Sequence, residues 1–197
     1  MKNWIGNKKS IYAPLGASNH SEYERAKQDY YATNPLAIDD LMRVEDFSDC
    51  IWEPACGEGH LSKRMYFEWA KQVYSTDLVN RGYGHDFFDF LKCDRKFEGD
   101  IITNPPYKFA KEFVEKAIEL TNNKVAMFLK LTFLEGQNRV KFFEKYPPVR
   151  IWIYSFRQSV ARNGEEKMFN KSSAVCYAWF IWEKGNKKLP VINWIKK

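Results

Sequence analysis

The 197-residue chain has few of the residues that build zinc sites and disulfide frameworks. It contains four cysteines, none of them in a Cys-x-x-Cys pair, and only three histidines. This composition argues against a zinc framework, so we expect no metal. The cysteine spacing does not resemble a disulfide scaffold either, which favours a reducing, cytoplasmic location.

Long hydrophobic runs are also missing. The first ten residues lack the apolar core of a signal peptide, and the longest uninterrupted apolar run, residues 174–182, is roughly half of a membrane span. We therefore expect no membrane association. No repeat or long linker divides the chain, so we expect an N-terminal arm at residues 1–30 and a single domain at residues 31–197.

The charges are distributed unevenly. Residues 1–107 carry a net charge of −4, whereas residues 108–197 carry +10, which accounts for the overall +6. A basic half is what a phosphate-backbone partner favours. A solvated, lysine-rich surface explains the same numbers, so charge alone leaves both interpretations open.

Short apolar runs alternate with helix-like stretches, which predicts an α/β fold with a mostly parallel sheet. Thr33 or Asn34 is suited to cap a first helix that has Pro35 in its first turn. We predict the last two strands to pair as an antiparallel hairpin. The expected strands are residues 50–53, 73–76, 83–86, 100–103, 125–129, 149–156 and 173–182, and the expected helices are residues 60–70, 108–120 and 135–146.

The segment from Glu53 to Gly59 (Glu-Pro-Ala-Cys-Gly-Glu-Gly) follows an apolar strand and precedes a helix. Small residues in such a turn let the backbone approach a ligand at the edge where open α/β sheets bind ligands. The third glycine of a dinucleotide-binding fingerprint is missing, and the Glu53 carboxylate suits a cationic ligand. An ordinary tight turn between strand and helix is the alternative.

Two further acidic residues follow predicted strands. Asp77 ends the second strand, where a carboxylate accepts hydrogen bonds from a ribose diol; capping the next helix is the alternative. Asp86, beside Phe87, would hold the amine and one face of an adenine ring. The alternative is a strand-end aspartate followed by two core phenylalanines.

The most specific feature is Asn104-Pro105-Pro106-Tyr107, directly after the predicted strand 100–103. Two prolines fix the backbone and remove two hydrogen-bond donors, which leaves carbonyls and the Asn104 side chain to accept hydrogen bonds from an amine. Tyr107 offers a flat face for stacking. The alternative is a Pro-Pro loop with a capping asparagine. It is plausible for an isolated tetrapeptide, but it is improbable for one that follows a strand in a chain with the glycine turn upstream.

Together these motifs resemble the amino-methyltransferase superfamily, and most closely the adenine methyltransferases of phages and prophages. Residues 29–35 resemble the segment that packs on the methionine part of the cofactor, and residues 17–20 and 133–136 look like further parts of the pattern, which covers about residues 15–182. The resemblance implies a Rossmann-like methyltransferase fold that binds S-adenosylmethionine in a bacterial or phage-infected cell. The implied cofactor-binding residues are Tyr30, Thr33, Pro35, Glu53, Ala55, Cys56, Gly57, Gly59, Asp77, Asp86, Phe87 and Asn104.

The resemblance also implies methylation of the exocyclic N6 amine of adenine in DNA, with the base flipped out of the duplex. Tyr107 would stack on the base, while the Asn104 side-chain oxygen and the Pro105 carbonyl accept the two amine hydrogens. Pro106 completes this catalytic tetrapeptide. Methyl transfer would then follow from positioning and from stabilisation of the developing positive charge, without a metal.

The chain has no room for a separate target-recognition domain, so we expect residues 157–172 to form a DNA-reading loop, although a loop without contacts to DNA is an equal alternative. The expected DNA-binding residues are Lys108, Arg139, Arg157, Gln158, Arg162, Asn163, Lys167 and Lys171. RNA adenine and the amide of a protein glutamine remain alternative substrates. An inactive DNA-binding or assembly protein is the alternative of a different class, and the oligomeric state stays open.

Overall fold

The computed structural model describes residues 31–162, 169 and 175–197. The expected N-terminal arm, most of the expected DNA-reading loop, and Tyr30, Asn163, Lys167 and Lys171 lie outside these residues. Among the described helices, none combines the length and apolar character that a membrane crossing requires.

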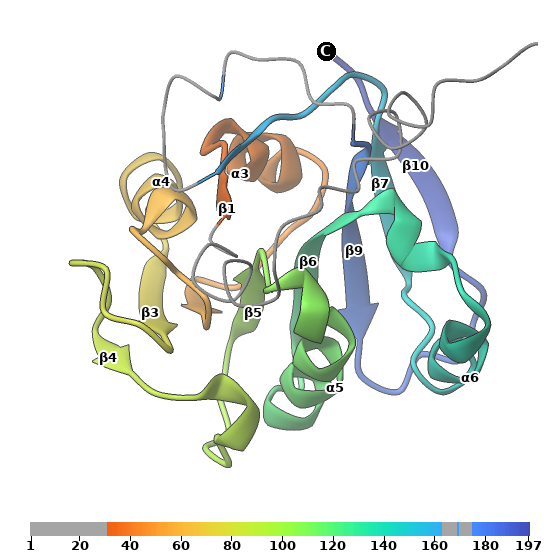
Figure 1. Cartoon of the computed structure of the whole chain (residues 1–197), viewed down its shortest axis with the longest axis horizontal. Coiled ribbons are helices and arrows are strands. Elements are labelled where there is room, and N and C mark those ends of the chain that lie inside the picture. The colour runs from red at the N-terminus through yellow and green to blue at the C-terminus, as the bar shows by residue number, and fades with distance from the viewer. Residues whose placement is uncertain (1–30, 163–168, 170–174) are drawn as a thin grey trace, which may run out of the picture.

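An eight-stranded sheet forms the centre of the molecule, in the order β10-β7-β9-β6-β5-β2-β3-β4 (Figure 1). β9 runs antiparallel to both of its neighbours, β6 and β7, while the other adjacent pairs are parallel. The predicted mostly parallel sheet and the antiparallel pairing near the C-terminus are therefore confirmed. The strands are β2 (Cys50–Glu53), β3 (Gln72–Asp77), β4 (Asp86–Phe87), β5 (Asp100–Thr103), β6 (Lys124–Lys130), β7 (Arg150–Tyr154), β9 (Tyr177–Glu183) and β10 (Val191–Ile195).

Helices cover both faces of the sheet, because its central strands bury side chains on both sides. In β6, Val125, Met127 and Leu129 pack in the core shared with α5 and α6, whereas Ala126 and Phe128 pack in the core shared with α3 and α4. This double burial explains why β6 reads as a continuous apolar run. The helices are α3 (Leu36–Met42), α4 (His60–Trp69), α5 (Ala110–Leu120) and α6 (Gln137–Lys145).

Three short strands lie outside the predicted pattern. β1 (Tyr31–Thr33) and β8 (Val160–Arg162) form a separate antiparallel pair, with Thr33 opposite Val160. Each has three residues, too few for a pattern, and their pairing joins segments far apart in the sequence. β10 adds an edge strand parallel to β7, beyond the predicted hairpin.

Several predicted boundaries shift slightly. The third predicted strand lies at Asp86–Phe87 rather than at 83–86, and the helix predicted from residue 108 begins as a 3-10 turn, η2 (Tyr107–Phe109), before α5. The N-cap residue of α3 is Pro35, not Thr33 or Asn34 as predicted, although the Asn34 side chain accepts a hydrogen bond from the Leu36 amide at 3.1 Å.

Candidate active site

A cavity of about 380 Å³ opens at the carboxyl ends of β2, β3 and β5, the edge where open α/β sheets bind ligands. The glycine turn after β2, the acidic end of β3 and the tetrapeptide after β5 all contribute to its wall. Its lining is Tyr31, Pro54, Ala55, Asp77, Leu78, Arg81, Asp89, Phe90, Leu91, Asn104, Pro105, Pro106, Tyr107, Phe109 and Phe113. The three predicted motifs therefore meet at one cavity.

The glycine turn is fixed to the end of β3 by its backbone. The Gly57 amide donates to Asp77 Oδ2 at 2.8 Å, and the Val79 amide donates to Asp77 Oδ1 at 2.9 Å. Each carboxylate oxygen keeps acceptor capacity beyond these bonds, so Asp77 remains able to accept from a ligand hydroxyl. The carboxylate thus both shapes the turn and faces the cavity.

Gly59 begins α4 in the left-handed conformation, with φ of +80°. A Cβ atom there would lie 2.4 Å from the ring of Tyr83, closer than side chains pack. Both backbone conformation and space therefore require glycine, so the last position of the predicted turn has a structural role, and Gly59 itself lines neither cavity.

Glu53 is buried below the turn, only 2% exposed. The Ser62 hydroxyl donates to its carboxylate, and the Ser62 and Ser75 hydroxyls are hydrogen-bonded at 2.6 Å. Burial raises the pKa of the Glu53 carboxyl to about 8, against the opposing effect of the Ser62 hydrogen bonds and with a smaller contribution from the Asp77 charge. A cationic ligand beside it would favour the ionised form.

Asn104 lies between this cavity and a much smaller one, of about 20 Å³, which Glu53, Cys56 and Thr33 also line. Its side-chain nitrogen donates to the Tyr31 carbonyl at 3.2 Å and to Thr33 Oγ1 at 2.8 Å. Its side-chain oxygen is buried and has no hydrogen-bond partner within the described structure. A buried acceptor without a donor is costly, so this oxygen is suited to a donor from a ligand.

Tyr107 is packed more closely than the sequence suggested. Its ring centroid lies 5.9 Å from that of Tyr31 and 6.4 Å from that of Tyr177, and the Lys130 ammonium lies 4.4 Å from its ring centroid. Burial is the main cause that raises the pKa of the Tyr107 hydroxyl well above its usual value. Tyr107 nevertheless lines the larger cavity.

The expected adenine-binding residues are not at the cavity. Asp86 and Phe87 form β4, are both exposed, and do not line it. Asp89, Phe90 and Leu91, three to five residues further on, do line it. Asp89 accepts a hydrogen bond from the Leu91 amide at 3.0 Å, which starts the 3-10 turn η1 (Phe90–Lys92) and brings this segment back to the cavity. An Asp-Phe pair occurs twice in this segment, at residues 86–87 and 89–90, and the sequence analysis selected only the first.

The other predicted cofactor-binding residues differ in their distance from the cavities. Ala55 lines both cavities, Thr33 and Cys56 line only the smaller one, and Pro35 precedes α3 and lines neither. Burial raises the pKa of the Cys56 thiol well above its usual range, so it remains a neutral thiol.

The expected DNA-binding side chains that the structure describes are partly used in internal contacts. Gln158 is buried, 5% exposed, and is not the exposed base-reading residue that we expected. Arg139 donates to the Phe133 carbonyl at 2.7 Å, and Arg157 donates to the Cys176 sulfur at 2.5 Å. Lys108 is exposed beside the cavity mouth, and Arg162 lies in β8.

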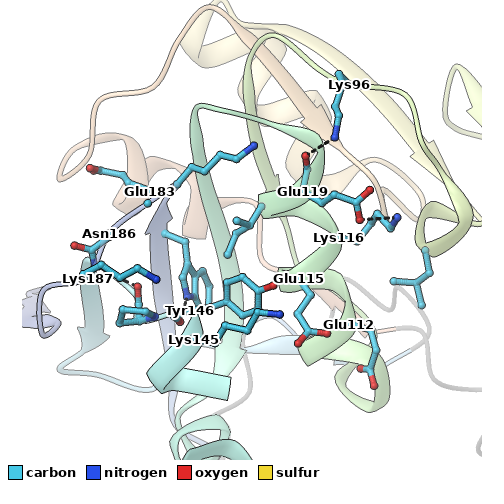
Figure 2. Close-up of a pocket in the computed structure, with 16 residues that line it drawn as sticks. Lys96, Glu112, Glu115, Lys116, Glu119, Lys145, Tyr146, Glu183, Asn186 and Lys187 are labelled. Carbon is cyan, nitrogen blue, oxygen red and sulfur yellow. Dashed lines mark hydrogen bonds and ion pairs between the residues drawn. The ribbon is translucent and has the colours of Figure 1, made fainter. Parts of the chain in front are cut away.

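A larger cavity, of about 770 Å³, is lined by α5 from Glu112 to Glu119, by the end of α6 and by the residues that follow β9, and it shares Leu91 with the first cavity (Figure 2). Both lysine and glutamate side chains line it, and Lys116 and Glu119 form an ion pair at 2.9 Å. It contains none of the predicted motif residues. Lysine and glutamate side chains together do not indicate one class of ligand. The predicted motif residues line the cavity beside Asn104, so we take that cavity as the candidate active site.

Comparisons with known proteins agree on the fold. No protein-family model matches the sequence, and no curated protein matches it significantly. A candidate RNA methyltransferase from Pyrococcus horikoshii is similar to this chain with a TM-score of 0.55 and 15% identity, over 92% of this chain and 99% of that protein. Magnesium protoporphyrin IX methyltransferase from Synechocystis, with bound S-adenosylmethionine, is similar with a TM-score of 0.51 and 11% identity, over 93% of this chain and 100% of that protein.

The methyltransferase subunit of a type I restriction-modification system from Streptococcus thermophilus gives a TM-score of 0.53 and 13% identity, over 81% of this chain and 45% of that subunit. At identities of 11–15%, these similarities show the fold alone. The chain has a Rossmann-like methyltransferase fold, as predicted. Within the described residues, no cluster of three or more metal-ligating side chains is present.

Proposed function

We propose that this chain is an S-adenosylmethionine-dependent methyltransferase that acts on the N6 amine of adenine in DNA. The observation that carries the proposal is the side-chain oxygen of Asn104, which is buried and lacks a donor in the described structure. An amine supplies two hydrogens, and methylation of an amine needs acceptors at this kind of position. The glycine turn, Asp77 and the fold support a cofactor site beside it.

The residues of the chain suit a cationic, nucleoside-containing cofactor. Glu53 supplies a buried carboxyl at the smaller cavity, while Asp77 supplies an anchored carboxylate at the larger one. Leu78, 67% exposed and lining the larger cavity, offers an apolar surface for a flat ring. S-adenosylmethionine would supply an electrophilic methyl group on its sulfonium.

Asn104 and the prolines would then act on the acceptor amine. The Asn104 oxygen and the Pro105 carbonyl would each accept one amine hydrogen, which turns the nitrogen lone pair toward the methyl donor. These acceptors also stabilise the positive charge that develops on the nitrogen. Tyr107, which lines the larger cavity, would stack on the ring.

The net charge of +10 on residues 108–197 favours a nucleic acid over a protein glutamine, and the resemblance to phage and prophage enzymes favours DNA over RNA. RNA adenine and a protein glutamine amide present a similar delocalised nitrogen and remain alternatives. An assay with labelled S-adenosylmethionine and equal amounts of unmodified duplex DNA, RNA and glutamine-containing peptides separates them. We expect label in DNA; label in RNA or peptide alone would replace the DNA assignment, and cofactor binding without any transfer would favour an inactive protein.

Replacement of Asp89 by alanine is expected to weaken cofactor binding by about tenfold, since the residue lines the cavity and shapes the η1 turn. Asp86→Ala, the matched control three residues away, is expected to change the affinity less than about twofold, because Asp86 is exposed outside the cavity. Calorimetric titration with S-adenosylmethionine measures both. A larger effect of Asp86→Ala would restore the assignment made from the sequence.

A further inference from the structure

The orientation of the Asn104 amide is set by β1. The Tyr31 carbonyl has lone pairs only, so the side-chain atom of Asn104 at 3.2 Å from it has to be the nitrogen. Thr33 Oγ1, at 2.8 Å from the same nitrogen, accepts its second hydrogen. With both hydrogens bonded to β1, the oxygen is directed away from this strand.

We infer that β1 is a positioning element, in which the Tyr31 carbonyl and the Thr33 hydroxyl hold the Asn104 amide with its oxygen toward the acceptor amine. The inference rests on the proposed function and assigns Thr33 a role through Asn104 rather than through the cofactor. Thr33 is 3% exposed, so its hydroxyl is held by its surroundings. β1 in turn pairs with β8, with Thr33 opposite Val160.

The same geometry accounts for asparagine, rather than aspartate, at position 104. In an Asn104→Asp variant, an ionised side chain would place a carboxylate oxygen against the Tyr31 carbonyl, where two acceptors face each other without a hydrogen. A protonated carboxyl restores one donor. The β1 carbonyl therefore selects an amide at this position.

Thr33→Val removes the hydroxyl at nearly constant volume, and Thr33→Ser keeps it. We expect kcat to fall about tenfold in Thr33→Val and to stay within about twofold of the native value in Thr33→Ser. The Kd for S-adenosylmethionine and the KM for DNA are expected to stay unchanged in both. A raised Kd with unchanged kcat in Thr33→Val would overturn the inference and place Thr33 among the cofactor contacts.

A second readout does not depend on turnover. In ¹⁵N-labelled protein, the Asn104 side-chain amide signals are identified by their loss in Asn104→Ala. We expect their exchange with water to accelerate in Thr33→Val and not in Thr33→Ser, whatever the methyl acceptor proves to be. Equal exchange in the native protein and Thr33→Val would overturn the positioning role even if methylation of DNA is found.

The pH profile of Asn104→Asp tests the Tyr31 contact. We expect this variant to be inactive above neutral pH and to regain part of its kcat as the pH falls and the carboxyl becomes protonated. Native activity at neutral pH would show that the Tyr31 carbonyl does not select the amide.

Discussion

Asn104→Ala is expected to lower methyl transfer by about a thousandfold or more while the affinity for S-adenosylmethionine changes less than about threefold. The reason is the buried side-chain oxygen, which has no donor in the described structure and belongs to a residue that lines both cavities. The side-chain nitrogen is already bonded to Tyr31 and Thr33, so alanine also leaves two polar groups of β1 without their donor.

The measurement is single-turnover transfer with saturating cofactor, together with a direct titration of the cofactor. Asn122→Ala is the matched control, because Asn122 is exposed and lines neither of the two cavities beside Asn104. We expect native rates for it. If cofactor affinity instead falls in parallel with activity in Asn104→Ala, Asn104 belongs to the cofactor site and the proposed acceptor role is wrong.

Glu53→Gln is expected to have opposite effects on stability and on cofactor binding. In the folded protein without ligand, the pKa of Glu53 is raised to about 8, from 4.5. The folded state therefore binds the proton more tightly than the unfolded state does, and native stability is lost as pH rises from 4.5 through 8. The difference between the folded and unfolded pKa of Glu53 corresponds to about 5 kcal/mol of free energy of unfolding. Because glutamine carries no charge to bury, Glu53→Gln is expected to be several kcal/mol more stable than the native protein at about pH 9.

The affinity for the cofactor is expected to increase with pH, whereas the stability of the native protein decreases. A cation beside Glu53 favours the carboxylate, so binding by the native protein is expected to strengthen as pH rises from about 6 to about 8, with release of a proton. Glu53→Gln is expected to lose this pH dependence and to bind about tenfold to a hundredfold more weakly at about pH 8. Glu58→Gln, an identical change in the same turn that lines neither cavity, serves as control. A pH-independent native affinity would contradict the account.

The sequence identified the parts of the site that lie at strand ends. Glu53, Asp77 and Asn104 follow β2, β3 and β5, and parallel strands bring their carboxyl ends to one edge, so spacing and strand pattern suffice. The antiparallel pairing of β7 and β9 was also predicted, from two late apolar runs joined by a polar connection.

What the sequence missed depends on contacts between distant segments. β1 and β8 have three residues each, and only their pairing places the Tyr31 carbonyl on Asn104. Asp89 rather than Asp86 lines the cavity because Asp89 caps the 3-10 turn η1, which the sequence analysis did not predict. Gln158 reads as a surface residue, yet it is buried.

The most direct test of the central claim is to locate the transferred methyl group. Duplex DNA is incubated with deuterated-methyl S-adenosylmethionine and the native protein, digested to nucleosides, and analysed by mass spectrometry. The account predicts N6-methyladenine that carries the heavy methyl group, absent with Asn104→Ala. A heavy methyl group on cytosine, or heavy N6-methyladenine that persists with Asn104→Ala, would contradict the assignment of this site to methylation of the adenine amine.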